Sequence, residues 1–309
     1  MTILVTGAGL IGTHAARSLL DQGTGVVLYD PEPAPDYIES VVGPDRKLFY
    51  VERGDVRDFP RLIDVVLRRG VTRILHTPAM AGHAADENPA LAFQTNVAGP
   101  LNLIEVARIR SLARIVLVSS SDVYGDGAPP PGAAPIVEHE VSWPSSSFDG
   151  AHKAMSEIMA LAYQRLAGVN AIIVRPCATY GLGGESAGSA YGQLVTEALA
   201  AAVASGDVKL ALPAVELVYA KDVAFALREA LFVEKPTSRV YNVGSGEIVS
   251  AGDLAAAIGA AVPDARITAE DLPGGRPRIL DTTLATRDLG YQSRWPLTQG
   301  IADLVATLR

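Results

Sequence analysis

Residues 2–12 read TILVTGAGLIG, an apolar, β-branched run that passes directly into three closely spaced glycines. Small and apolar residues then recur at helical spacing, so the segment predicts a strand, a tight turn and a helix. Such glycines let the backbone approach a pyrophosphate closely, and the helix N-terminus offers free N–H groups. We therefore expect a dinucleotide here, although glycine turns also join strands to helices for purely steric reasons. The residues expected to hold it are Gly7, Gly9, Leu10, Ile11 and Gly12.

The second apolar run, residues 26–29, ends in Asp30. An acidic residue about 20 residues after the glycines accepts a hydrogen bond from the ribose 2′-hydroxyl of a dinucleotide. Asp30 and nearby Glu32 would also repel a 2′-phosphate, which favours NAD over NADP. The alternative is that Asp30 only opens the turn at Pro31, a position that suits aspartate.

The composition favours a small-molecule ligand. Of the 309 residues 49% are hydrophobic, so the chain can bury a substantial core. The formal net charge is −8 and no Lys/Arg cluster offsets it, which argues against binding to nucleic acid or to an anionic membrane.

A single cysteine, Cys177, excludes an intramolecular disulfide, and no Cys/His spacing indicates a metal site. Because we find neither a leader-like start nor a stretch approaching about 18 apolar residues, we expect a cytoplasmic protein.

Strand-like and helix-like runs alternate along the chain, which predicts an α/β fold: a doubly wound parallel (Rossmann) sheet with a smaller C-terminal substrate lobe. Ligands would bind at the carboxyl ends of the strands. We expect the NAD-binding core in residues 1–175, with 214–250 returning to it, and the lobe in 176–213 and 251–309. Beyond the first two strands, the expected strands are 47–51, 73–76, 114–118 and 171–174, and the expected helices are 59–69, 89–110, 149–167 and 191–204.

Further motifs follow the glycine turn in a fixed order: Gly54-Asp55-Val56-Arg57-Asp58, Ile74-Leu75-His76-Thr77-Pro78-Ala79, Asn96-Val97-Ala98-Gly99, Ser119-Ser120-Ser121-Asp122-Val123-Tyr124-Gly125, Arg175-Pro176, Tyr180-Gly181, Val218-Tyr219-Ala220-Lys221-Asp222-Val223 and Tyr241-Asn242-Val243-Gly244. In this order they resemble the extended short-chain dehydrogenase/reductases, the NAD-dependent epimerase/dehydratase family. The series is far more specific than any one motif. The resemblance covers nearly the whole chain and implies NAD as the cofactor.

The resemblance also implies roles for residues around the cofactor. Asp55 and Val56 should flank the adenine, Pro78 and Ala79 should line the nicotinamide side of the pocket, and Asn96 should brace that region. For Asp55 a plain turn residue is the alternative, and for Asn96 a satisfied polar group on a helix. The glycine turn has one residue between its first glycines where the family usually has two, but this spacing matches the general dinucleotide fingerprint.

By the same resemblance, catalysis uses a tyrosine as acid/base, a lysine four residues later and a serine that hydrogen-bonds the substrate oxygen. A lysine on the same helix face lowers the phenol pKa from its ordinary value near 10 by favouring phenolate. Ser120 matches the serine and Lys153 the lysine, which in the family also hydrogen-bonds the nicotinamide ribose. The tyrosine position holds Asp149. An alignment that inserts one residue would place Phe148 there instead, a side chain without a hydroxyl.

Aspartate is no easy substitute for tyrosine. Its ordinary pKa is about 3.9 and Lys153 should lower it, so near pH 7 Asp149 would be ionised and unable to donate a proton. It would act as a base if a buried site raised its pKa. Asp122 lies where the related sugar dehydratases carry an acidic residue used in proton abstraction. Other groups that could replace the phenol, each with a core or rim position as the alternative, are His76, Tyr124, His152, Tyr180 and Tyr191.

The predicted lobe departs from the pattern of nucleotide-sugar enzymes. These usually present an arginine just before the segment matched by 218–223, where it pairs with a diphosphate. This chain has Glu216 there, which would oppose a diphosphate. We therefore expect a smaller polar or carboxylated substrate, contacted by Ser121, Tyr180, Tyr191 and Arg276. Arg278 is a further candidate for anion binding, with a solvated surface position as the alternative.

The sequence thus predicts an NAD-dependent epimerase/dehydratase-like enzyme for a small polar substrate, sugar-like or hydroxy/carboxylated, with non-standard acid/base chemistry in a hydride or proton transfer. Two alternatives stay open: a catalytically silent NAD-binding sensor or partner-binding protein, and a nucleotide-sugar epimerase or dehydratase. Small and apolar residues on helices 89–110 and 149–167 predict a homodimer, as in the family. The alternative is that these residues only pack on the sheet.

Overall fold

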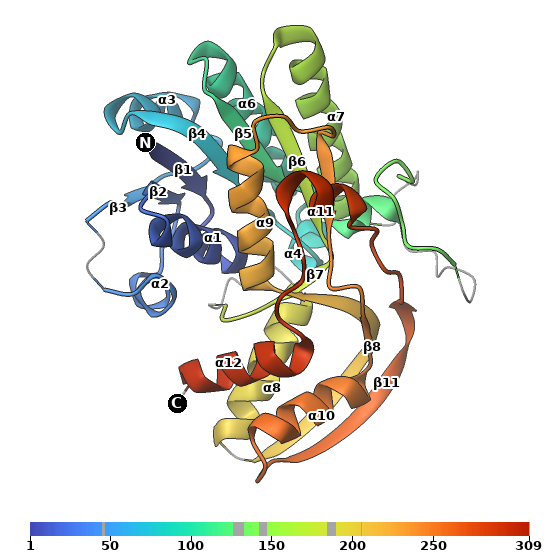
Figure 1. Cartoon of the computed structure of the whole chain (residues 1–309). Helices are drawn as coiled ribbons and strands as arrows, with labels where there is room; N and C mark the ends of the chain where they lie inside the picture. Colours follow the sequence, from blue (N-terminus) through green and yellow to red (C-terminus); the bar gives the residue numbers. More distant parts are fainter. Residues whose placement is uncertain (45–46, 126–132, 142–146, 184–189, 205, 309) are drawn as a thin grey trace.

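The computed structural model describes residues 1–44, 47–125, 133–141, 147–183, 190–204 and 206–308, which form a large and a small sheet (Figure 1). Seven parallel strands build the large sheet in the order β3-β2-β1-β4-β5-β6-β9. The predicted doubly wound α/β fold is therefore confirmed. The strands of this sheet are β1 (Thr2–Thr6), β2 (Gly25–Asp30), β3 (Phe49–Arg53), β4 (Val71–His76), β5 (Arg114–Val118), β6 (Ala171–Pro176) and β9 (Val240–Val243).

The order of the large sheet reverses beside β1, which is where ligands bind in sheets of this type. In the register of the sheet, Thr6 at the end of β1 lies opposite Tyr29 of β2 and His76 of β4. The chain passes from Thr6 directly into the glycine turn. This turn, the end of β2 and the loop after β4 therefore meet at one edge.

Helices cover both faces of the large sheet. One face carries α1, α2 and α9, and the other carries α3, α6 and α7. The helix predicted over 89–110 is present as two helices, α5 and α6, separated by a π-helical turn at Gln94–Ala98. The helices around this sheet are α1 (Leu10–Asp21), α2 (Pro35–Val42), α3 (Phe59–Arg68), α4 (His83–Glu87), α5 (Pro89–Phe93), α6 (Gly99–Ile109), α7 (Phe148–Ala167), α9 (Ala220–Phe232) and α11 (Thr283–Leu289).

The small sheet lies beyond the carboxyl ends of the large one, in the lower half of Figure 1. Its central strand, β8 (Asp207–Tyr219), pairs with β7 (Ala178–Tyr180), β10 (Ile248–Val249) and β11 (Arg266–Arg276). Its apolar cluster also takes side chains from α8 (Ala190–Ala204), α10 (Ala251–Ala261) and α12 (Leu297–Leu308). α11 packs instead against α9 and β9 of the large sheet. The domain boundaries drawn from the sequence stay a prediction. Within the described ranges, every helix is too short or too polar to span a lipid bilayer.

The first residues after β7 tie the two sheets together. The carbonyl oxygen of Leu182 accepts a hydrogen bond from the Tyr37 hydroxyl at 3.0 Å and lies 3.2 Å from Nε2 of His14. Burial lowers the pKa of His14 to about 4, so near pH 7 the ring is neutral and donates one hydrogen bond. α1 and α2 thus hold the chain where it enters the small lobe.

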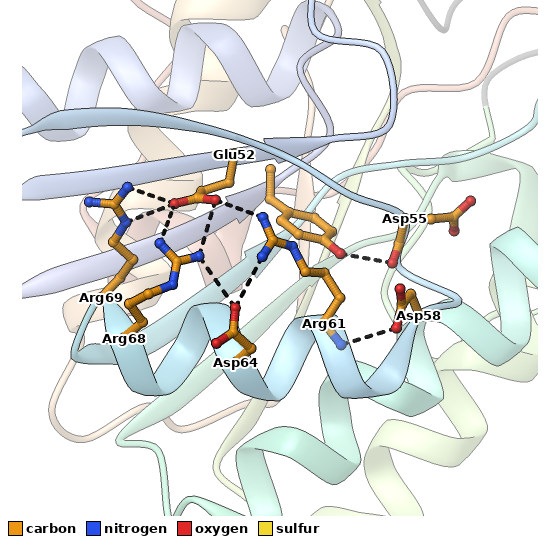
Figure 2. Close-up of polar contacts among 8 residues, drawn as sticks. Glu52, Asp55, Asp58, Arg61, Asp64, Arg68 and Arg69 are labelled. Atoms are coloured by element: carbon orange, nitrogen blue, oxygen red, sulfur yellow. Dashed lines mark hydrogen bonds and ion pairs between the residues drawn. The ribbon is translucent and has the colours of Figure 1, made fainter.

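A cluster of charged side chains fastens α3 to β3, an edge strand of the large sheet (Figure 2). The Glu52 carboxylate of β3 is almost fully buried and accepts hydrogen bonds from Arg61 at 3.0 Å, Arg68 at 3.0 Å and Arg69 at 2.6 Å. Arg61 and Arg68 also bond Asp64, which is half exposed. Because three cations face one shielded carboxylate, Glu52 carries most of the charge pairing in this cluster.

Replacement of Glu52 by glutamine should destabilise the fold. Hydrogen bonds from Arg68 and Arg69 hold the pKa of Glu52 at about 2, below its ordinary value of 4.5. Since the folded-state pKa is depressed, the stabilisation is complete above pH 4.5 and is lost as the pH falls toward 2. We expect Glu52→Gln to lower the free energy of unfolding by about 1–3 kcal/mol near pH 7, and by less near pH 3, in urea titrations.

The matched control is Asp64→Asn, which should change the free energy of unfolding by less than about 0.5 kcal/mol because its carboxylate is half exposed. A Glu52→Gln deficit that is as large near pH 3 as near pH 7 would contradict the assignment.

Apolar side chains lie exposed on neighbouring parts of α5 and α7. Phe93 is 45% exposed, Phe148 48%, Met155 44% and Ile158 56%. Phe93 and Phe148 both contact the ring of His152, so they belong to one surface. An exposed apolar surface of this kind is typical of a protein–protein contact. It lies on the helices for which the sequence predicts pairing with a second copy.

If this surface is a homodimer interface, light scattering at micromolar protein should give twice the 32.3 kDa mass of the chain. Ile158→Glu would bury charges at the two-fold contact and should give the monomer mass. Leu272→Glu, at a 40% exposed apolar position of β11, is the control and should leave the mass unchanged. A monomeric wild-type protein would rule out the interface.

Candidate cofactor and active site

A cavity of about 600 Å³ opens at the carboxyl edge of the large sheet, where the small lobe meets it. Its walls come from the glycine turn, the segments after β4, β5 and β6, α7 and the small lobe. Among the lining residues are Gly7, Gly9, Leu10, Ile11, Asp30, Pro78, Ala79, Ser119, Ser120, Ser121, Asp122, Asp149 and Lys153 from the core, and Cys177, Tyr191, Val215, Glu216 and Arg278 from the segments beyond β6.

The glycine turn has the geometry that a close backbone approach requires. Gly7 has φ +87°, a conformation that disfavours other residues, and its N–H donates to the Tyr29 carbonyl at 2.8 Å. A Cβ on Gly12 would lie 1.9 Å from the carbonyl oxygen of Gly7. Gly12 therefore faces the turn rather than the cavity, and its missing side chain lets α1 begin directly against β1. These features suit a pyrophosphate at the α1 N-terminus.

Asp30 joins the ends of two strands. One oxygen of its carboxylate accepts a hydrogen bond from the N–H of Ala8 at 2.8 Å, and the other accepts from the N–H of Glu32 at 2.8 Å. Asp30 thus organises the turn that follows it, and it also lines the cavity. A carboxylate has further lone pairs, so these two bonds leave acceptor capacity for a ribose hydroxyl.

The other residues predicted for the cofactor fall into two groups. Pro78 and Ala79 line the cavity, and Asn96 holds the loop that carries them through two hydrogen bonds of 2.8 Å with the backbone of Met80. Asp55 and Val56 are not among the residues that line the cavity.

The side chains of Asp55 and Val56 are engaged elsewhere. The Asp55 carboxylate is paired with the guanidinium of Arg57, whose hydrogen bond lowers the pKa of Asp55. The Val56 side chain is buried, and a Cβ on Gly99 would lie 2.6 Å from it. The place of these two residues beside the adenine stays a prediction.

The serine and the lysine predicted for catalysis lie together on the cavity wall. The Ser120 hydroxyl accepts a hydrogen bond from the N–H of Asp122 at 3.1 Å. The buried ammonium of Lys153 donates to the Val118 carbonyl at 3.0 Å. Burial lowers the pKa of Lys153, and the neighbouring carboxylates of Asp149 and Asp122 oppose this shift. Ser121 and Asp122 also line the cavity.

The pKa of Asp149 differs from the one expected from the sequence. Asp149 is 8% exposed, and its Oδ1 is buried without a hydrogen-bond partner among the described residues. Burial raises the pKa of Asp149 above its ordinary value, and the attraction of Lys153 only partly opposes this. Lys153 lowers the pKa of Asp149 as expected, but the net pKa is raised, because loss of solvation outweighs one neighbouring cation.

Tyr124 and His76, two other proton donors suggested by the sequence, are not available to a substrate. The Tyr124 residue lines it, but its hydroxyl donates to Asn242 at 2.5 Å and accepts from Arg175 at 2.7 Å. Burial raises the pKa of Tyr124 to about 12. His76 is fully buried beside β1, where burial lowers its pKa to about 3. Neither ring is placed to replace the phenol.

Of the remaining aromatic candidates, Tyr191 lines the cavity, whereas Tyr180 and His152 do not. Tyr191 lines the cavity, as predicted for a substrate residue, and burial raises its pKa. Tyr180 does not line it, because its ring is buried in the small lobe against Tyr219. His152 packs between Phe93 and Phe148 outside the cavity, and Phe148 itself is 48% exposed. The alignment that places Phe148 at the tyrosine position therefore puts no side chain in the site.

Three charged residues near the small lobe are, from the sequence, candidates for contacting the substrate or for opposing an anion: Glu216, Arg276 and Arg278. Arg276 ends β11, but its side chain lies outside the described part of the chain, whereas Arg278 lines the cavity. Glu216 is 1% exposed and accepts hydrogen bonds from the N–H groups of Gly246 at 2.8 Å and Leu280 at 3.0 Å. Burial raises the pKa of Glu216 to about 7, and these hydrogen bonds oppose the shift.

Three lining residues, Cys177, Thr77 and Ser119, were not among the site residues predicted from the sequence. Cys177 is buried and also lines the cavity. Thr77 and Ser119 follow β4 and β5 directly, so their position at strand ends is the signal that could have found them. In the part of the chain that the structure describes, no group of three or more His, Cys, Asp or Glu residues could hold a metal ion.

A family model described as the NAD dependent epimerase/dehydratase family matches residues 3–244. UDP-glucuronate 4-epimerase 6 of Arabidopsis thaliana is 34% identical over 192 residues, which cover 59% of this chain and 40% of that protein. UDP-glucose 4-epimerase of Schizosaccharomyces pombe is 33% identical over 144 residues, 44% of this chain and 40% of that protein. The matched part thus spans about two fifths of the length of each of these curated relatives.

Among the solved structures that cover 100% of this chain are two different enzymes. UDP-glucose 4-epimerase of Thermus thermophilus, solved in complex with NAD, is 26% identical with a TM-score of 0.80 over 99% of its own chain. A partial consensus L-threonine 3-dehydrogenase is 24% identical with a TM-score of 0.84, also over 99% of its chain, and supports the fold alone.

Asp30 offers a direct test of the cofactor site. Asp30→Ala removes the acceptor at the end of β2, so calorimetry should show NAD binding weakened by about tenfold or more and a smaller preference for NAD over NADP. Asp36→Ala, at an exposed position of α2, is the control and should bind NAD like the wild type. Unchanged NAD affinity of the Asp30→Ala variant would refute the assigned role.

Proposed function

This chain belongs to the NAD dependent epimerase/dehydratase family, and we propose that it is an NAD-dependent enzyme that oxidises, epimerises or dehydrates a small sugar-like or carboxylated substrate with Asp149 as acid/base. The observation that carries this proposal is the position of Asp149. Its buried carboxylate shares one cavity wall with Ser120 and Lys153, and one of its oxygens has no partner among the described residues. A buried ionisable group without a partner is typical of a catalytic site.

The predicted cofactor is confirmed, because the family is NAD-dependent and the Thermus thermophilus neighbour was solved with NAD. The glycine turn would hold the pyrophosphate, Asp30 the adenosine ribose, and Pro78 and Ala79 the nicotinamide side. Lys153 would hydrogen-bond the nicotinamide ribose. Bound NAD would supply the acceptor for the hydride that leaves the substrate carbon.

The proton chemistry follows from the raised pKa of Asp149. Burial brings its protonated and ionised forms closer in free energy near neutral pH than in an exposed carboxyl. As a base, the ionised carboxylate takes the proton of a substrate hydroxyl while that carbon–oxygen bond becomes a carbonyl. As an acid, the protonated form returns it. The Ser120 hydroxyl would hydrogen-bond the same substrate oxygen, and the Lys153 ammonium would stabilise negative charge there.

The length of the Asp149 side chain bears on the substrate. An aspartate carboxylate reaches less far from the helix than a tyrosine hydroxyl does. The reacting oxygen must therefore come closer to α7, or one water must bridge it to Oδ1. The first arrangement favours a compact substrate that enters deeply.

A nucleotide-sugar epimerase is the second candidate function. The names of the curated relatives, UDP-glucuronate and UDP-glucose 4-epimerases, favour it. Glu216 stands where such enzymes usually present an arginine to a diphosphate, so the described cavity wall lacks that donor, which disfavours a bound diphosphate. A silent NAD-binding sensor is the third candidate, and the loss of the phenol favours it.

One experiment separates the three candidates. The absorbance of reduced nicotinamide is followed in NAD-loaded protein while hydroxy acids, sugars, aldehydes and UDP-sugars are added singly, with mass spectrometry of the products. We expect turnover of a small sugar or hydroxy acid. Turnover of UDP-sugars alone would favour the second candidate. Tight NAD binding without an absorbance change or a product would favour the sensor.

Asp149→Asn tests the acid/base role. The amide has the same size but accepts no proton, so kcat/KM for the substrate found in the panel should fall by about 100-fold or more while NAD affinity is kept. Because the pKa of Asp149 is raised, the acid limb of the wild-type kcat/KM profile should lie above the ordinary carboxyl value of 3.8 and should be absent in the variant. The control is Asp36→Asn on α2. A variant with full activity and an unchanged profile would exclude Asp149.

A further inference from the structure

Arg278, two residues after the end of β11, lines the cavity. One of its terminal nitrogens, Nη1, donates to the backbone carbonyl of Tyr124 at 3.0 Å. Its Nε is buried and has no hydrogen-bond partner in the described part of the chain. No carboxylate of the described residues pairs with it. A buried guanidinium donor without an acceptor is costly, and a carboxylate or phosphate relieves that cost with two parallel hydrogen bonds.

The backbone around Arg278 is fixed before any ligand binds. The buried carboxylate of Glu216 accepts a hydrogen bond from the N–H of Leu280 at 3.0 Å. Ile136 exchanges two backbone hydrogen bonds of 2.8 Å with residues 279–281. Arg278 therefore projects from a segment that is held on both sides, so little conformational entropy is lost when its guanidinium binds.

The charges around the cavity make Arg278 the group best suited to an anion. The Lys153 ammonium donates to the Val118 carbonyl and lies beside Asp149, so its charge is already partly balanced. The Glu216 carboxyl, although it contacts the same segment, is taken up by backbone N–H groups. Arg278 is bonded to the carbonyl of Tyr124, at the end of the segment that also carries Ser120 and Asp122, so an anion bound to it would lie in the same cavity as these residues.

We propose that Arg278 binds a single anionic group of the substrate, a carboxylate or a phosphate monoester, and thereby selects anionic sugar-like substrates over neutral ones. This inference rests on the proposed function, since it assigns the substrate class of the same cavity. One planar fork suits one carboxylate or one terminal phosphate, and the described small-lobe wall offers no second arginine for a diphosphate.

Equilibrium binding to the NAD-saturated protein tests the inference. Calorimetry is run with glucuronate, glucose 6-phosphate, neutral glucose and UDP-glucose, and the first two distinguish a carboxylate from a phosphate. We expect at least one of these two anions to bind about 10- to 100-fold more tightly than glucose. Arg278→Met should remove that preference while the weak affinity for glucose stays the same. Arg278→Lys, which lacks the fork, should keep only part of it.

Arg266→Met is the matched control, because Arg266 begins β11 and does not line the cavity. It should keep the full preference. NAD affinity and thermal unfolding of each variant verify the fold, and Arg278→Gln replaces Arg278→Met if the latter unfolds. Equal affinity for glucose and both anions, or a preference that survives loss of the guanidinium, would overturn the inference. Since the readout is binding, absence of turnover in the substrate panel would refute the proposed function and leave anion selection standing.

Discussion

The hydrogen bond of 2.8 Å from the N–H of Ala8 to the carboxylate of Asp30 joins the ends of β1 and β2, and the geometry of the whole site depends on it. It forms because parallel strands deliver successive turns to one edge of the sheet. Gly7, with φ +87°, lets the chain turn sharply there, and Gly12 leaves room for its carbonyl oxygen. The glycine turn, the Asp30 carboxylate and the cavity wall beside them are thereby fixed relative to one another.

For Asp149 and Lys153, burial outweighs charge pairing in setting the direction of the pKa shifts. Asp149 and Lys153 lie one helical turn apart, and loss of solvation raises the pKa of the acid and lowers that of the base. Each shift favours the neutral form, and the attraction between the two groups opposes both. A buried carboxyl of this kind exchanges its proton nearer neutral pH than an exposed carboxyl does.

The family model ends before the last segment of the cavity wall. The family model covers residues 3–244, which include the cofactor turn and the Ser120–Lys153 wall. Arg278 lies beyond this stretch, on a segment that Glu216 and Ile136 hold against the core. The part of the cavity that would recognise a substrate is therefore built partly from a region that the family model does not reach. The carbonyl of Leu182, at the start of the small lobe, also contacts His14 of α1 and Tyr37 of α2, so the two parts of the chain are held together there.

The sequence by itself determined the doubly wound sheet, the cofactor turn and the family, because these depend on local periodicity and on glycines at fixed spacing. It also located Ser120, Lys153 and the replacement at Asp149. Only the tertiary structure decided the protonation tendency of Asp149, since burial depends on distant elements. Only the tertiary structure likewise showed that Tyr180 is buried in the small-lobe core and that Asp55 pairs with Arg57. It also showed that Arg278 lines the cavity. The direction in which a side chain projects is set by long-range packing, which a local pattern does not contain.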